Sequence, residues 1–102
     1  MSNTYTQEQI DGISRFEINK AVGIKRGVYD EYDDIANDYV GKPERYMAIA
    51  IEHGIDINFN YHNSEAWCYR SDFECYVETK RYDNTDTGLA VCAAFLMMEK
   101  SQ

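Results

Sequence analysis

The sequence has few of the residues on which small catalytic and metal sites depend. Its 102 residues include two histidines, three cysteines and one proline, and no pair of cysteines has the C-x-x-C spacing that is typical of zinc sites. No positively charged start leads into an apolar stretch, as it would in a signal peptide. The longest apolar run falls short of the ~18 residues that a membrane-spanning helix needs. We therefore expect no metal, no cofactor, no catalytic residue and no membrane span, and a reduced protein in the cytoplasm.

Basic residues are also scarce. Ten Lys and Arg stand against 18 Asp and Glu, which gives a net charge of -8. Because such a chain repels phosphate, we expect no direct binding to nucleic acid or to an anionic membrane. A hydrophobic fraction of 44% with six glycines is typical of a globular protein. The length suits one domain, which we predict over residues 13–102, after a flexible N-terminal tail at residues 1–12.

The chain does contain one long apolar segment, from Asp86 to Lys100. No charged residue lies between Asp86 and Glu99, and a helix that is apolar on nearly every side has to be buried. Thr85 or Asp86 can cap its amino end, where a carboxylate also suits the helix dipole. The segment predicts a buried C-terminal helix around which the rest of the domain is organised.

Two shorter helices are expected earlier in the chain. Ser14 and Glu17 have the S-x-x-E spacing of a capping box, and Gly23 follows where a C-terminal glycine is common. These signals predict a helix from Arg15 to Val22. A second helix is predicted from Pro43 to His53, because proline is favoured at the first helical position and a glycine follows the histidine.

The periodicity then changes to that of strands. Apolar and polar residues alternate from Ile55 to Tyr61, and further strands are predicted at Glu65 to Arg70 and Phe73 to Tyr82. Ser71 and Asp72 would form the two-residue turn between the last two. The expected fold class is α+β, with an antiparallel sheet of three to four strands packed between helices.

That turn would place Cys68 opposite Cys75 in the sheet. The pair could form a disulfide or, with Cys92, His53 or His62, a metal site. Cytosolic thiols in strands are more often small buried hydrophobic residues, and this is the interpretation that we favour.

The same turn would place Trp67 opposite Tyr76, near Tyr69, Phe59 and Tyr61. Such an aromatic group resembles the stacking platforms of sheets that bind single-stranded nucleic acid. Those platforms also carry Lys and Arg, whereas the neighbouring residues here are glutamates. We therefore expect the aromatic residues to be packed in the core or covered by a helix.

Residues 24–40 lack a sustained period and are expected to form a long acidic loop, with a short edge strand near Ile35 to Tyr39. Carboxylates at close spacing can meet the Lys and Arg of a partner protein. A solvated loop without a partner is the alternative. The predicted partner-binding residues of this loop are Tyr29, Asp30, Glu31, Tyr32, Asp33, Asp34 and Asp38.

Three blocks of the sequence resemble the NinX family of small proteins from lambdoid phages, for which no activity is established. Residues 15–22, R-F-E-I-N-K-A-V, are similar to the family's opening S-D-F-E-I-N-K-x-V. Residues 38–43, D-Y-V-G-K-P, are similar to its D-Y-C-N-N-P, and residues 89–99, which end F-L-M-M-E, to its terminal A-x-x-x-F-L-M-M-Q. The resemblance implies phage or prophage origin and action in a bacterial host. It transfers no catalytic residue.

From the charge and this resemblance, we expect an accessory protein that binds a host or phage protein. A basic nucleic-acid-binding surface is the partner that an acidic loop would suit, as in counter-defence. The alternative is a structural module that self-associates through Met97, Met98 and the aromatic residues of the sheet, so both a monomer and a homodimer remain open. An enzyme is not expected, and His53 and His62 are interpreted as capping or surface residues.

Overall fold

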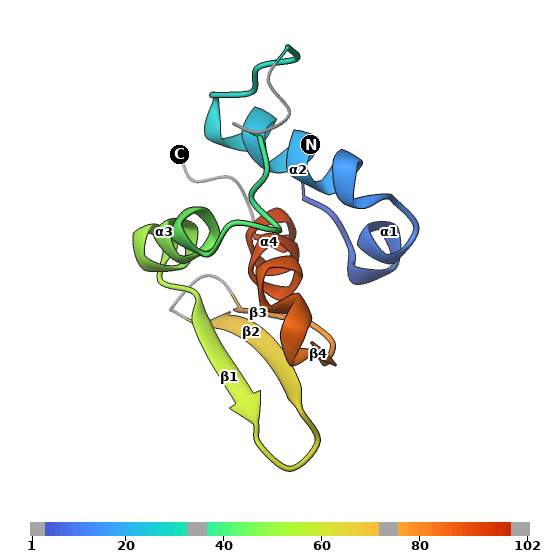
Figure 1. Ribbon diagram of the computed structural model, residues 1–102, viewed down its shortest axis with the longest axis vertical. Helices are drawn as coiled ribbons and strands as arrows, with labels where there is room; N and C mark the ends of the chain where they lie inside the picture. The colour runs from blue at the N-terminus through green and yellow to red at the C-terminus, as the bar shows by residue number, and fades with distance from the viewer. Residues whose placement is uncertain (1–3, 33–36, 72–75, 99–102) are drawn as a thin grey trace.

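The structure, a computed structural model, describes residues 4–32, 37–71 and 76–98 (Figure 1). The strands form one antiparallel sheet, in which β2 pairs with each of the others. The elements are α1 (Gln7–Asp11), α2 (Arg15–Arg26), α3 (Pro43–His53), β1 (Asp56–Asn60), β2 (Glu65–Ser71), β3 (Tyr76–Glu78), β4 (Tyr82–Asp83), the 3-10 turn η1 (Asn84–Asp86) and α4 (Thr87–Met97). The predicted α+β class is confirmed.

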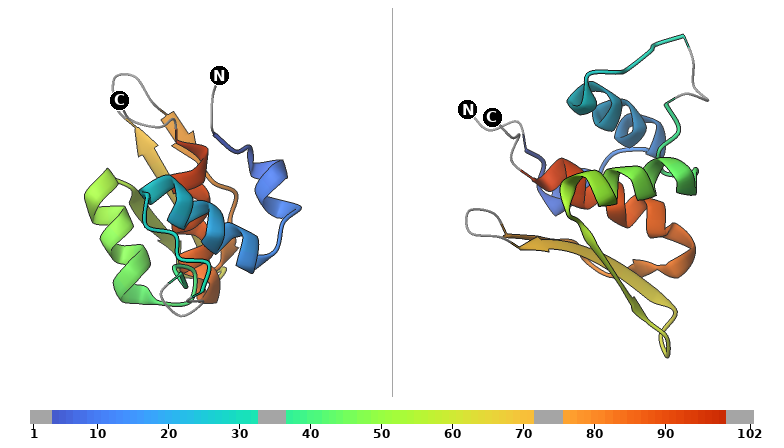
Figure 2. Two further views of the ribbon diagram at one scale, coloured as in Figure 1. Left: turned by 90° about the horizontal axis from the view of Figure 1, so that it is seen from above. Right: turned by 90° about the vertical axis from the view of Figure 1, so that its left-hand side faces the viewer.

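The C-terminal helix α4 is the central layer of the molecule. It contacts β2 on one side and α2 and α3 on others, and residues 90–96 are each at most 2% exposed. The predicted buried C-terminal helix is therefore confirmed. The order of layers differs from the prediction in one respect, because the described helices all lie on one side of the sheet (Figure 2). The sheet covers α4 and is not itself packed between helices.

Close contact between α4 and the chain before α3 depends on Gly88. A Cβ atom at this position would overlap the carbonyl oxygen of Val40 and lie 2.6 Å from Cδ2 of Tyr46. Both neighbours are held by the core, since Val40 is buried and Tyr46 packs against the buried cluster. Position 88, in the first turn of α4, therefore has no room for a side chain.

The other end of α4 is held by Lys25 of α2. Its ammonium group donates hydrogen bonds to the carbonyl oxygens of Phe95 and Met98, the latter at 2.7 Å, and lies 4.6 Å from the centroid of the Phe95 ring. The last carbonyls of a helix lack partners within the helix, and a cation is favourable there. Lys25 thus joins α2 to α4 by hydrogen bonds as well as by packing.

The flexible tail predicted for residues 1–12 is wrong for the part that is described. Thr6 forms a capping box with the glutamine three residues later and starts α1. Ile10 is buried, and the amide of Tyr5 donates a hydrogen bond of 3.0 Å to the carbonyl of Leu96. So short a helix is stable only through its tertiary contacts. The mostly polar sequence of this segment gives no sign of those contacts, and the helix was therefore not predicted.

The helix predicted to stop at Val22 continues to Arg26. It starts as expected, with the amide of Glu17 donating to the hydroxyl of Ser14, but it ends at Gly27, which has φ +77°. Gly23 instead lies inside the helix, where a Cβ atom would be 3.3 Å from Tyr29. Of the expected edge strand, residues 37–39 are described and are not in a strand.

The bounds predicted for the second helix are confirmed, since α3 ends before Gly54, which has φ +67°. The register of the last hairpin was predicted incorrectly. Tyr76 faces Ser71 instead of Trp67, a shift of four positions, and Cys75 lies outside the described residues. Because the shift is even, each described side chain stays on the face that was predicted for it.

We predict that Gly88→Ala destabilises the protein by about 3 kcal/mol or more, because the added methyl group must displace backbone at Val40. The matched control is Gly12→Ala at the end of α1, where the nearest atoms would be carbonyl oxygens at 3.6 and 3.7 Å. That change should alter the free energy of unfolding by less than about 1 kcal/mol. Urea denaturation measures both, and equal midpoints for the two variants would contradict the prediction.

Candidate functional site

The most distinctive surface is the side of the sheet that faces away from α4. Ala66 and Cys68 of β2 are fully buried beneath α4, and residues that alternate with them point the opposite way. No described helix covers this side (Figure 2). We call it the outer face, and the register places on it Asp56, Asn58, Trp67, Tyr69, Tyr76 and Glu78.

The expectation that Trp67, Tyr69 and Tyr76 would be covered by a helix is therefore wrong. Tyr76 is 65% exposed, and the other two are half-buried among their neighbours in the sheet. Phe59 and Tyr61, which belonged to the same predicted group, are also exposed. Among the described elements, α1, α2 and α3 lie against α4, so none of these helices covers this side of the sheet.

A cation is already held at one end of the outer face. The guanidinium carbon of Arg81 lies 3.9 Å from the centroid of the Trp67 ring, and its Nη1 lies 4.0 Å from Oε1 of Glu65. This is a cation–π contact supported by a carboxylate. An aromatic ring and a carboxylate also lie side by side among the next set of residues that face one another across the strands, which we call a row.

In that row, Tyr69 of β2 lies between Asp56 of β1 and Glu78 of β3. Directly opposite residues in an antiparallel sheet have Cβ atoms about 5 Å apart. Within the described part of the chain, neither carboxylate forms an ion pair. Glu78 accepts a hydrogen bond of 2.6 Å from the hydroxyl of Tyr76, which raises the pKa of that tyrosine. The row is an aromatic ring with a carboxylate on each side and no cation of its own.

The predicted acidic loop has a different character. The ring of Tyr29 packs against Gly23, with the Lys20 ammonium 5.6 Å from its centroid. Asp30 accepts a hydrogen bond of 2.9 Å from the amide of Tyr32, and the Asn37 side chain bonds both backbone groups of Asp30. These bonds give part of the predicted loop a structural role.

Asp38 also serves the fold. It accepts hydrogen bonds from the amide of Gly41 at 3.0 Å and from the Asn19 side chain at 3.4 Å. Asn19 in turn accepts from the amides of Tyr39 and Val40. This network fixes the chain on α2 before α3 begins.

Of the seven predicted partner-binding residues, Asp30, Glu31 and Tyr32 are exposed. Asp33 and Asp34 lie outside the described residues. The structure therefore brings an exposed carboxylate pair and a tyrosine together at the start of the loop. It also shows a surface that sequence reasoning missed, because Asp56 and Glu78 meet only through the register of three strands.

Neither histidine belongs to a metal-binding group among the described residues. The ring of His53 lies 4.8 Å from that of Phe95, and partial burial lowers its pKa, an effect to which Lys25, Arg26 and Arg70 add and which Glu52 opposes. The direction of this shift favours the neutral imidazole of His53. His62 is exposed. Within residues 4–32, 37–71 and 76–98, no three His, Cys, Asp or Glu gather as a metal site would require.

No family model, curated protein or solved structure matches this chain. The resemblance to the NinX family therefore stays a prediction from three blocks of sequence. None of the helices in the described part of the chain combines the length and the apolar character that crossing a membrane would require.

We predict that Cys68 and Cys92 resist alkylation in the folded protein. Burial raises the pKa of Cys68 to about 12 and raises that of Cys92 as well. At about pH 8, Cys68 then has roughly a thousandfold less thiolate than an unperturbed thiol. The measurement is iodoacetamide labelling of a Cys75→Ser variant followed by mass spectrometry. Labelling before denaturant is added would contradict the prediction and would reopen a redox or metal role.

Proposed function

We propose that this chain is a small acidic accessory protein of phage or prophage origin that binds a basic surface of another protein in the bacterial host cytoplasm. The observation that carries the proposal is the outer face, where aromatic rings alternate with carboxylates on an uncovered sheet. The proposed action is binding, without a catalytic step.

The distribution of ion pairs supports a basic partner. Several basic side chains join elements of the fold, as Arg26 does with Glu52 at 3.1 Å and Lys80 with Asp11 at 3.0 Å. Asp56 and Glu78 have no such partner among the described residues. With a net charge of -8, the chain attracts cationic surfaces and steers them toward such carboxylates.

The chemistry of the outer face favours arginine in particular. A guanidinium group can stack on the ring of Tyr69 while it donates hydrogen bonds to Asp56 and Glu78 on either side. The contact of Arg81 with Trp67 and Glu65 is an intramolecular example of the same arrangement. Proteins that hold nucleic acid present clusters of Arg and Lys. A chain that occupies such a cluster would prevent it from binding phosphates, as a counter-defence protein does.

The acidic loop remains a second contact candidate within the same function. Glu31 and Tyr32 are exposed there, whereas Tyr29 and Asp38 make contacts that hold the loop. Self-association through Met97 and Met98 is less well supported than it was from the sequence. Met98 is buried in the core of its own chain and Met97 packs partly against it.

We predict that Asp56→Asn combined with Glu78→Gln lowers affinity for a fluorescent arginine–glycine repeat peptide about tenfold. The two changes remove carboxylates that would pair with the same cations, so the dependence of affinity on salt should also weaken. Fluorescence anisotropy titrations at two salt concentrations measure both effects. The matched control is Asp30→Asn combined with Glu31→Gln, which removes the same number of charges from the acidic loop.

The control separates the location of the charges from their number. Retention of affinity by the loop variant supports the outer face as the binding surface. Equal losses in both variants would mean that net charge alone attracts the peptide, and a loss in the loop variant only would move the site to the loop. Either of these results overturns the assignment to the outer face.

A further inference from the structure

The edge of the sheet formed by β1 is open. Among the described strands, β1 pairs with β2 only, so the backbone groups on its other side have no partner in the sheet. Natural edge strands are usually protected by proline, lysine, a bulge or a short length. β1 has five residues in continuous register and contains neither proline nor lysine. Such an edge is suited to pairing with another strand.

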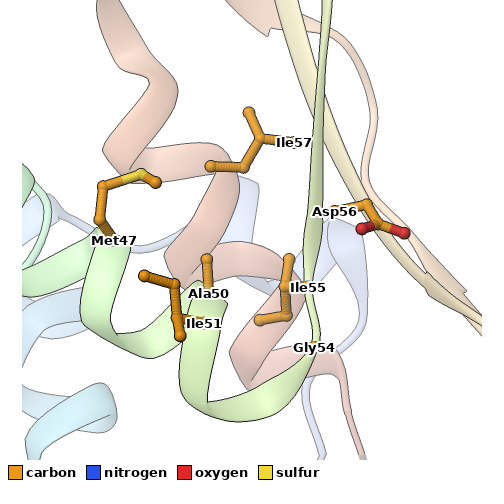
Figure 3. Close-up of a pocket in the computed structure, with 7 residues that line it drawn as sticks. All are labelled: Met47, Ala50, Ile51, Gly54, Ile55, Asp56 and Ile57. Atoms are coloured by element: carbon orange, nitrogen blue, oxygen red, sulfur yellow. The ribbon is translucent and has the colours of Figure 1, made fainter.

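Apolar side chains surround this edge on the side that faces the helices. An open hollow of about 370 Å³ lies between α3 and β1 (Figure 3). Ile51 on its wall is 78% exposed, and Phe59, two residues beyond Ile57 on the same side of the strand, is 62% exposed. The hollow is lined by Met47, Ala50, Ile51, Gly54, Ile55, Asp56 and Ile57. Side chains of this kind at a strand edge favour a protein partner over solvent.

We propose that the open edge of β1 pairs with β1 of a second copy of this chain, antiparallel and about a two-fold axis through Asn58. In this register Ile57 lies opposite Phe59 of the second copy, and Asp56 lies opposite its Asn60. All five residues of the strand are then paired.

The sequence of β1 is self-complementary in this register. Ile57 and Phe59 pair as apolar residues on the face toward the helices, and the axis repeats this contact twice. Phe59 of one copy then lies beside Ile57 of the other, at the hollow below α3. Asp56 meets an uncharged asparagine, so no like charges face each other across the strands. Two copies of a chain with a net charge of -8 repel each other overall. Facing carboxylates at the contact would add to that repulsion, and this register has none among the paired residues of β1.

The interface would be small. One strand edge and the side chains around the hollow would bury an area near or below ~1,200 Å², the low end of specific interfaces, where weak and transient complexes are found. The dimer joins two sheets edge to edge, with both outer faces on the same side. The inference does not rest on the proposed function. The residue changed in its first test, Phe59, lies outside the outer face, although Asp56 and Asn58 of the same strand lie on that face.

Sedimentation velocity over a concentration series of roughly 10 μM to 1 mM tests for the dimer. The wild-type protein should shift from monomer toward dimer, and Phe59→Asp should raise the dissociation constant at least tenfold. The matched control is Phe16→Asp, which replaces a phenylalanine of similar exposure, 57%, on α2. A wild-type protein that stays monomeric, or a control that loses the dimer equally, overturns the proposal.

A cross-linking experiment tests the register and does not depend on Phe59. In a Cys75→Ser background, Asn58→Cys places two thiols at the axis, where paired Cα atoms lie about 5 Å apart and a disulfide can form. Oxidised glutathione should then give a covalent dimer. In the Asn60→Cys control, the thiols are offset by four residues, about 13 Å along the strand, and should not link. Equal cross-linking of the two variants, or none in Asn58→Cys, overturns the register.

Discussion

The full burial of α4 is the constraint on which the rest of the structure depends. A helix that exposes no side chain along residues 90–96 needs cover in every direction. The sheet supplies one side, where Ala66 and Cys68 pack beneath it, and α2 and α3 supply others. Gly88 at one end and Lys25 at the other fix how closely these neighbours approach. Because the other described helices are all used to cover α4, none of them covers the other side of the sheet, and the outer face is the consequence (Figure 2).

Elements whose signals are local could be predicted from the sequence. Proline at the start of α3, glycine after it and strict alternation in β1 each act within a few residues, and these elements are where they were expected. The end of α2 was predicted incorrectly because the sequence has two glycines, Gly23 and Gly27, either of which could end the helix. Gly23 is required by the packing of Tyr29, whereas Gly27 is required by its own backbone conformation. Sequence spacing cannot distinguish a glycine that makes space from one that ends a helix.

The candidate site was predicted less well than the fold. The sequence shows how many carboxylates there are, but it does not show which of them accept hydrogen bonds within the protein and which are left for a partner. Asp30 and Asp38 looked like surface charges but accept backbone hydrogen bonds that shape the loop. Glu78 was considered only as one of the glutamates near the aromatic residues, and Asp56, far from it in the sequence, was not linked with it. They become neighbours of Tyr69 only because β2 pairs with both flanking strands in a register that a short-turn assumption placed incorrectly.

The two surfaces left open by this fold differ in chemistry and so suit different partners. The outer face is aromatic and acidic, whereas the hollow below α3 is lined mainly by apolar side chains (Figure 3). Because pairing at the edge keeps both outer faces on the same side, dimerisation would not compete with binding of a basic partner. A partner with two or more arginine-bearing segments would meet two equivalent faces at once. The second contact then forms at high effective concentration, which strengthens binding without any new interaction. Weak self-association and modest affinity at each face are therefore compatible with tight binding of an extended basic surface.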